Sequence, residues 1–293
     1  MHFKTTLLDK KYKLYNMIMC WITYLLIILL LWYILTRIGT HIIFRPQRTC
    51  WPLHMPFQSV QAGPLCGVYL PAHGTYPTLL FFHGRAGNIS HFESFAQTYA
   101  PLGYGILLFD YRGFGQSIGT PSQQHLQQDA QTVLSYAVKE LHIPPQQLVI
   151  YGHSLGNAAA LYAAQFGKSL SLKALILQSP FLSTPDMAAS WQTKGYFPHK
   201  LNYRLVRTLV IPFLWRNRFD NTRLTVGLNL PVLLCSSKAD KTLPWQQSAK
   251  LADGIVKVQR FLANTGGHDE FAWAATAVDQ FLKQLPSSAS PSL

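Results

Sequence analysis

The sequence predicts an α/β fold: a mostly parallel sheet with helices on both faces, preceded by one membrane-spanning helix. Short apolar runs rich in β-branched and aromatic residues alternate with longer segments of helical periodicity along most of the chain. This alternation is typical of parallel sheets that are covered on both sides. A separate uncharged apolar run near the amino terminus, residues 17–35, lies outside the alternation and predicts the membrane helix.

Length and composition favour one large α/β domain with a short appendage. The chain has 293 residues, of which 48% are hydrophobic and 13% are charged. The formal net charge is +13, but no zinc-finger, RNA-recognition or helix-turn-helix pattern accompanies it, so we expect no nucleic-acid partner. An anionic membrane surface or an acidic substrate suits the charge better. The four cysteines form no C-x-x-C pair and indicate neither a disulfide scaffold nor a zinc site.

The apolar run at residues 17–35 is long enough to cross a bilayer. At about 1.5 Å per residue it covers nearly the ~30 Å of the hydrocarbon core. The alternatives are a buried helix of a soluble protein, which the many consecutive Leu and Ile residues disfavour, and a cleaved signal peptide. A signal peptide has a shorter apolar run, about 7–15 residues, and a small-residue cleavage site, which is poor here. We expect an uncleaved single-pass anchor, with residues 1–16 as a basic tail and residues 36–64 as a connector.

The orientation of the anchor follows from the basic residues beside it. Four lysines precede it and three arginines follow it closely (Lys4, Lys10, Lys11, Lys13; Arg37, Arg45, Arg48), which gives a slight bias towards a cytoplasmic amino terminus. A first anchor with basic residues ahead of it usually exports the part of the chain after it. We therefore expect the folded domain outside the cytoplasm, on the periplasmic or lumenal side. In such an oxidising compartment Cys50 and Cys66 could pair.

The folded domain is expected over residues 65–285, with a flexible tail over residues 286–293. Its strands are predicted at residues 65–71, 77–83, 105–110, 148–151, 173–178, 231–236 and 256–262. Ser90 and Glu93 predict a capping box for the first helix of the domain, and Thr120 predicts the cap of the next helix, with Pro121 in its first turn. Further helices are expected from residue 158, near residues 245–251, and over residues 269–285.

Residues 183–229 interrupt the alternation of strands and helices. They mix aromatic with basic side chains, a combination that also occurs in proteins that bind single-stranded nucleic acid. Because the segment is inserted between two predicted strands, we interpret it as a short helical cap over the functional site.

The clearest motif is Gly152-His153-Ser154-Leu155-Gly156, which stands between a predicted strand and an alanine-rich helix. Strand, G-x-S-x-G and helix together form the context of a nucleophile elbow. The two glycines let strand and helix approach closely, and the serine hydroxyl is exposed at the turn. A plain glycine-rich turn is the alternative interpretation.

A serine hydroxyl becomes a good nucleophile only when a histidine, itself oriented by a carboxylate, removes its proton. His268 follows the last predicted strand and precedes the final helix, so we expect it to be the base. Asp240 follows its strand directly and is the expected acid. Asp186 is the second choice, and Asp269 is interpreted as a helix-start residue.

The other histidines are assigned structural roles. His83 and His153 are interpreted as structural neighbours of the site, because each lies in a turn next to the sheet. The remaining eight are interpreted as surface or capping residues (His2, His41, His54, His73, His91, His125, His142 and His199).

The order Ser154, Asp240, His268 is that of the α/β-hydrolase superfamily, which the sequence resembles over residues 65–285. It is similar more narrowly to the membrane-anchored bud-emergence-type hydrolases, often grouped with prolyl-oligopeptidase-like domains. Four blocks carry this resemblance: FFHGRAGN, FDYRGFGQSIGTPS, YGHSLG, and SSKADKTLP with GGHDE. The resemblance implies that the backbone N–H groups of Arg85 and Leu155 form an oxyanion hole, although the relatives commonly have Asn where Arg85 stands.

The resemblance also implies that Asp110 and Arg112 brace the oxyanion loop. The implied reaction is hydrolysis of an ester, thioester or amide through an acyl-enzyme, without a metal or organic cofactor. The substrate would be a small-molecule or lipid acyl compound, or an acylated protein. Peptidases, lipases, esterases and acyltransferases share this machinery, and a catalytically silent membrane scaffold is the alternative of another class.

Overall fold

The centre of the protein is one eight-stranded sheet, seen in a computed structural model that describes residues 2–187 and 217–286. The strand order is β1-β2-β4-β3-β5-β6-β7-β8. The first two strands are antiparallel to their neighbours, and all strands from β3 to β8 are parallel, which confirms the predicted fold class. The strands are β1 Gln58–Ala62, β2 Leu65–Leu70, β3 Thr78–Phe82, β4 Gly105–Phe109, β5 Leu148–His153, β6 Ala174–Gln178, β7 Val232–Ser237 and β8 Val258–Ala263.

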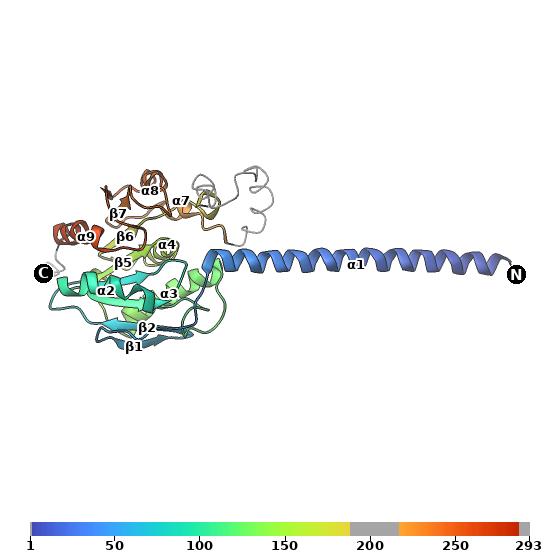
Figure 1. The fold of residues 1–293 in the computed structure, drawn as a ribbon, viewed down its shortest axis with the longest axis horizontal. Helices are drawn as coiled ribbons and strands as arrows, with labels where there is room; N and C mark the ends of the chain where they lie inside the picture. Colours follow the sequence, from blue (N-terminus) through green and yellow to red (C-terminus); the bar gives the residue numbers. More distant parts are fainter. Residues whose placement is uncertain (1, 188–216, 287–293) are drawn as a thin grey trace.

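Helices cover both faces of the sheet (Figure 1), which explains why the central strands are apolar throughout. Successive side chains of a strand point to opposite faces. Leu107 of β4 therefore packs in the core beneath α3 and α4, whereas Leu108 packs in the core beneath α2 and α9. The helices of the domain that lie wholly within the described residues are α2 Glu93–Tyr99, α3 Gln123–Lys139, α4 Gly156–Phe166, α7 Asn221–Leu224, α8 Trp245–Ala252 and α9 Ala272–Gln284, with short 3-10 helices η1 Ile89–Phe92, η2 Ala100–Leu102 and η3 Pro145–Gln147.

Two predicted helix caps are wrong, because a different residue caps each helix. The 3-10 helix η1 is capped by Asn88, whose side chain accepts from the N–H of Ser90. Glu93 closes no capping box with Ser90. Its carboxylate instead accepts hydrogen bonds from the backbone of the segment that precedes β1. Helix α3 is capped by Ser122, not Thr120, because the Ser122 hydroxyl accepts from the N–H of His125 at 3.0 Å.

The predicted amino-terminal apolar helix is present and is longer than the predicted span of residues 17–35. It forms one continuous helix, α1 His2–Phe44, which projects from the domain (Figure 1). Within its segment Lys11–His41, an 18-residue window reaches a mean hydropathy of 2.5, so this segment is long and apolar enough to cross a membrane. The helix includes the first residues of the predicted connector, residues 36–44. The sheet also begins earlier than predicted, with β1 before residue 65. Only residues 45–57 therefore connect the helix to the sheet.

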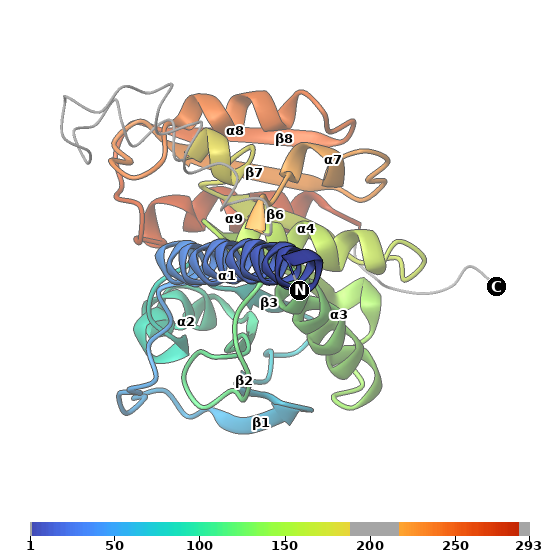
Figure 2. The same cartoon turned by 90° about the vertical axis from the view of Figure 1, so that its right-hand side faces the viewer.

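The last turn of α1 is embedded in the domain. Ile43 and Phe44 are buried in the core beneath α3 and α4, and the Phe44 ring lies 6.4 Å from that of Phe114 and 5.8 Å from that of Phe219. The hydroxyl of Thr40 accepts a hydrogen bond from Asn217 Nδ2 at 3.2 Å. Because these contacts lie on loops that follow parallel strands, α1 leaves the domain at the edge where those strands end. Viewed along α1 (Figure 2), the helix stands in front of the middle of the domain.

Two further expectations concern the cap and the cysteines. Most of the predicted cap, residues 188–216, and the last seven residues of the predicted tail, 287–293, lie outside the described residues. All four cysteines are described and carry free thiols, so Cys50 and Cys66 form no disulfide in this structure.

Candidate active site

Ser154 lies at a sharp turn between β5 and α4, with a backbone φ of +53°. Such a left-handed conformation is unfavourable for a serine and persists only where its surroundings enforce it. A Cβ on Gly152 would lie 2.7 Å from the Cα of Asn157, and a Cβ on Gly156 would lie 1.9 Å from the carbonyl oxygen of Phe82. Glycine is therefore required at both motif positions, as a nucleophile elbow demands.

The buried side chain of Asn157 holds this turn in place by hydrogen bonds. Asn157 Nδ2 donates to the backbone oxygen of Ser154 at 2.9 Å and to that of Gln178 at 2.8 Å. The N–H of Ser154 donates to the same Gln178 oxygen at 3.1 Å. The elbow is thus tied to the end of β6. Sequence reasoning missed Asn157, although a polar residue at the start of an otherwise alanine-rich buried helix was a usable signal.

The structure brings together the three side chains expected to form a triad. His268, in the loop between β8 and α9, has its Nε2 atom 2.9 Å from Ser154 Oγ. Its Nδ1 atom lies 2.8 Å from Asp240 Oδ2. Both contacts are satisfied together by a neutral imidazole that donates from Nδ1 and accepts the Ser154 hydroxyl proton at Nε2. All three residues follow parallel strands, which explains how distant parts of the sequence meet at one edge.

The second carboxylate oxygen of Asp240 is also occupied. Oδ1 accepts from the backbone N–H of Thr242 at 2.7 Å and of Leu243 at 2.8 Å. Burial acts to raise the pKa of Asp240, but the hydrogen bond and charge of His268 and the two N–H groups outweigh it, and the net pKa is lowered. The carboxylate is therefore ionised at neutral pH and positioned to orient His268.

The two other candidate acids make different contacts. The Asp186 carboxylate accepts a hydrogen bond from the Ser183 hydroxyl. The side chain of Asp269 is 78% exposed, and its nearest described ionic contact is His153 Nε2 at 3.9 Å. Asp240 is thus the carboxylate that the described contacts place on His268.

His83 and His153 both contact the backbone of the site, in agreement with their interpretation as structural neighbours. His153 Nε2 donates to the backbone oxygen of His268 at 2.8 Å, and burial is the main cause that lowers the pKa of His153 to about 4. His83 Nδ1 lies 2.8 Å from the oxygen of Gly84.

One group of side chains has the composition of a metal site. Ligand-type atoms of His153, His268 and Asp269 lie within 4.8 Å of one another. Both ring nitrogens of His268 already contact Ser154 and Asp240, and Nε2 of His153 contacts a backbone oxygen. These residues therefore fit a hydrogen-bonding system better than a metal-binding site.

The segments expected to supply the oxyanion hole lie beside Ser154. Leu155 directly precedes the first residue of α4, and the loop of residues 83–88 passes close enough that a Cβ on Gly84 would lie 3.5 Å from Ser154 Cβ. Asp110 does brace this region, because its Oδ1 accepts from the N–H of Ile89 at 2.8 Å. The expectation for Arg112 is wrong: its side chain pairs instead with Asp129 of α3 at 2.8 Å.

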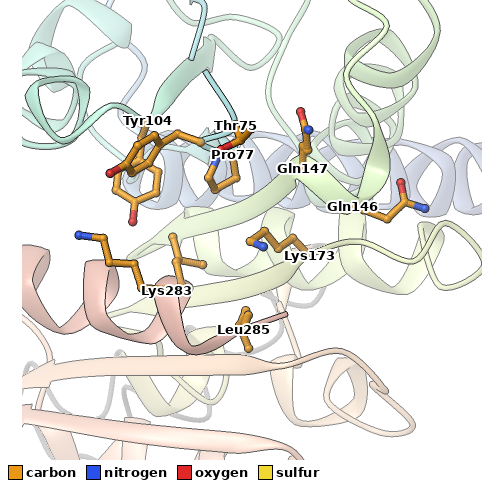
Figure 3. A pocket seen from close by; sticks show the side chains of 10 residues that line it. Thr75, Pro77, Tyr104, Gln146, Gln147, Lys173, Lys283 and Leu285 are labelled. Carbon is orange, nitrogen blue, oxygen red and sulfur yellow. The ribbon is translucent and has the colours of Figure 1, made fainter. Parts of the chain in front are cut away.

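A cavity of about 530 Å³ opens at the opposite edge of the sheet (Figure 3). Pro77, Tyr104, Gln147 and Lys173 are among its lining residues, and each directly precedes a parallel strand. The cavity is therefore separated from Ser154 by the length of the strands and is not part of the candidate active site.

Comparisons with known proteins agree with this fold. A family model described as alpha/beta hydrolase fold matches residues 77–217. Protein bem46 of Schizosaccharomyces pombe is 31% identical over 176 residues, covering 60% of this chain and 55% of bem46. Lysophosphatidylserine lipase ABHD12 of Danio rerio is 31% identical over 188 residues, covering 61% of this chain and 47% of that protein. The chain thus spans about half the length of each of these two relatives.

Among solved structures, the Pyrococcus furiosus esterase Pf2001 has a TM-score of 0.65 at 16% identity, covering 82% of this chain and 97% of that chain. This similarity concerns the fold. The similarity to bem46 confirms the resemblance to the bud-emergence-type hydrolases. On the matched family model, these relatives and the eight-stranded sheet, this chain belongs to the α/β-hydrolase fold family.

Proposed function

We propose that the protein is a serine hydrolase that cleaves an acyl ester through an acyl-enzyme on Ser154. The observation that carries this proposal is the continuous pair of hydrogen bonds from Ser154 Oγ to His268 Nε2, 2.9 Å, and from His268 Nδ1 to Asp240 Oδ2, 2.8 Å. A nucleophile, a base and an orienting carboxylate within hydrogen-bond reach are the parts that acyl transfer requires.

Each residue has a defined role in this mechanism. Ser154 Oγ attacks the carbonyl carbon of the substrate while His268 Nε2 accepts the hydroxyl proton. The ionised carboxylate of Asp240 stabilises the imidazolium that forms. The backbone N–H groups of Arg85 and Leu155 donate to the oxygen that becomes negative in the tetrahedral intermediate. When the intermediate collapses, the bond to the leaving alcohol breaks, and the alcohol takes the proton from His268.

Water completes the cycle by the same steps. His268 removes a proton from the water as it attacks the acyl carbon, and the proton then passes to Ser154 Oγ as the acid is released. Thioesters and amides would react through the same intermediates, so a panel of matched ester, thioester and amide substrates distinguishes these activities from one another.

The position of α1 favours a lipid substrate. The helix leaves the domain at the edge that carries Ser154, because its last turn packs on Phe114 and Phe219 in loops that follow parallel strands. With α1 in a bilayer, this edge faces the membrane surface, where lipid esters are available. The relative named lysophosphatidylserine lipase agrees with this substrate class. The slight charge bias around the anchor supports a location of the domain outside the cytoplasm.

A fluorophosphonate probe, which reacts with activated serines, tests the proposal. The wild-type protein should be labelled and should hydrolyse a p-nitrophenyl ester, and Ser154→Ala should do neither. Ser171→Ala is the matched control, because Ser171 also has a positive φ, +49°, but precedes β6 at the other edge of the sheet and should keep full activity. An unlabelled wild-type protein would support the alternative of a silent membrane scaffold.

A further inference from the structure

The segment that joins α1 to the sheet lies across the loop that follows β3. We call residues 46–49 the strap and residues 83–88 the oxyanion loop. Pro46 of the strap forms a parallel β-bridge with Gly87 of the oxyanion loop, and the N–H of Gln47 donates to the Gly87 oxygen at 3.3 Å. The strap thus pairs directly with the loop expected to supply one oxyanion donor.

Asn88, at the end of the oxyanion loop, strengthens this pairing. It is fully buried, and its Nδ2 donates to the backbone oxygens of Gln47 at 3.2 Å and of Thr49 at 2.7 Å. Its Oδ1 accepts from the N–H of Ser90 at 3.0 Å. A single side chain therefore joins the strap to the start of η1.

The strap is also bound to the loop that follows β4. The oxygen of Gln47, which accepts from Asn88, accepts in addition from the N–H of Gly115 at 2.8 Å. The guanidinium of Arg48 donates to the backbone oxygen of Ser117 at 2.8 Å. The strap therefore lies between two loops at the catalytic edge and connects them.

The chain beyond the strap is held as well. The N–H of Trp51 donates to the Ser90 hydroxyl at 3.1 Å, and the N–H of Met55 donates to the Glu93 carboxylate at 2.8 Å. Together with the buried end of α1, these contacts fix the segment at both ends. The position of the strap is thus determined by the domain and by the anchor.

We propose that the strap is a positioning element of the oxyanion hole, through which the membrane anchor and the active site form one unit. The inference rests on the proposed function. Oxyanion donors are effective only when they are held close to the productive geometry, within about 0.5 Å. The oxyanion loop contains Gly87, with a φ of +85°, and a glycine leaves a loop conformationally free unless other contacts restrain it. The strap supplies those contacts.

The test compares two amide-to-carboxylate substitutions in the full-length protein in detergent micelles. Asn88→Asp keeps the acceptor for Ser90 but places a carboxylate oxygen against the two strap oxygens. Gln165→Glu is the matched control, because Gln165 Nε2 also donates to two backbone oxygens, those of Leu224 at 2.7 Å and Val226 at 2.9 Å, at the end of α4 that is far from Ser154. Each variant is assayed for kcat and KM with a soluble p-nitrophenyl ester and for its unfolding temperature.

We expect Asn88→Asp to lower kcat by about 10- to 100-fold, since loss of one whole oxyanion donor costs about 10²–10³-fold, with KM changed by less than about threefold. Gln165→Glu should lower the unfolding temperature and leave kcat unchanged. Arg48→Met and Arg48→Lys form a second pair: Lys retains a donor for the Ser117 oxygen and Met does not, so Arg48→Lys should retain more of kcat than Arg48→Met. This pair decides the question if Asn88→Asp does not fold.

A folded Asn88→Asp protein with wild-type kcat would overturn the proposal. A loss of kcat in Gln165→Glu as large as that in Asn88→Asp would also overturn it. If Asn88→Asp does not fold, the same conclusion follows when both Arg48 variants have the kcat of the wild type. A wild-type protein that neither hydrolyses the ester nor reacts with the fluorophosphonate would instead overturn the proposed function, and the role of the strap with it.

Discussion

His153 donates a hydrogen bond from Nε2 to the backbone oxygen of His268 at 2.8 Å, so that a buried neutral histidine holds the residue expected to act as the base. The other ring nitrogen, Nδ1, is among the buried side-chain atoms without a hydrogen-bond partner in the described part of the chain. Protonation of this ring would bury a charge directly beside His268.

The first prediction concerns the pH dependence of stability. The folded-state pKa of His153 is lowered from 6.5 to about 4, so between these values the unfolded chain binds a proton that the folded protein does not. The free energy of unfolding should therefore fall as the pH is lowered from 7 towards 4, by up to about 1.4 kcal/mol per pH unit. Urea unfolding at pH 7, 6 and 5 measures this, and His153→Gln, which keeps a donor for His268, should show a weaker dependence. Equal pH dependences would contradict the assignment.

The second prediction separates the two candidate carboxylates. Asp240→Asn keeps the shape of the side chain but removes the charge that orients and stabilises the imidazole, so kcat for an ester should fall by about 10⁴-fold. Asp186→Asn should retain activity, because that carboxylate contacts Ser183. Steady-state kinetics on both purified variants is the measurement, and the reverse ranking would move the acid to the loop after β6.

The third prediction concerns the glycines. A Cβ on Gly156 would lie 1.9 Å from the carbonyl oxygen of Phe82, whereas a Cβ on Gly63, with a φ of +58°, would meet nothing within 4 Å. Gly63→Ala should therefore lower the free energy of unfolding by the backbone cost alone, about 1–2 kcal/mol. Gly156→Ala should cost at least about 3 kcal/mol, at or above the upper end for overpacked cores. Denaturant unfolding of both variants measures the two losses of unfolding free energy. A smaller loss for Gly156→Ala than for Gly63→Ala would show that α4 can move away from β3 at little cost.

The fourth prediction concerns the anchor. The full-length protein should stay in the membrane fraction after alkaline carbonate washing, because Lys11–His41 is apolar enough to span. Protease added to intact cells or spheroplasts should degrade the hydrolase domain while cytoplasmic markers survive. Release by carbonate would argue against a span, whereas protection from protease until permeabilisation would reverse the proposed orientation.

The site was largely predictable because its determinants are local or topological. The elbow depends on residues within a single pentapeptide and its flanks, and in a parallel sheet the residues that follow each strand meet at one edge. That rule placed Asp240 and His268 beside Ser154 without any knowledge of distances.

The errors involve contacts between segments distant in sequence. Glu93 has the spacing of a capping residue, but its buried carboxylate is taken by N–H groups 38 and 39 positions earlier. Arg112 follows Asp110 closely but pairs with α3. Asn88 and Gln47 are separated by 41 positions, and no periodicity or turn signal relates them. Local rules describe the preferences of a side chain, whereas the packed domain decides which partner it meets.

α1 continues as one helix from the apolar segment into the buried Phe44, so no break in the helix separates that segment from the folded domain. A transmembrane helix adapts to bilayer thickness by changing its tilt. With α1 in a bilayer, as proposed, the rigidly attached domain must turn with the helix, and Ser154 would change its height and angle above the lipid headgroups. Under the proposed function, membrane composition would then act on this protein mechanically, by setting which acyl bonds come within reach of Ser154.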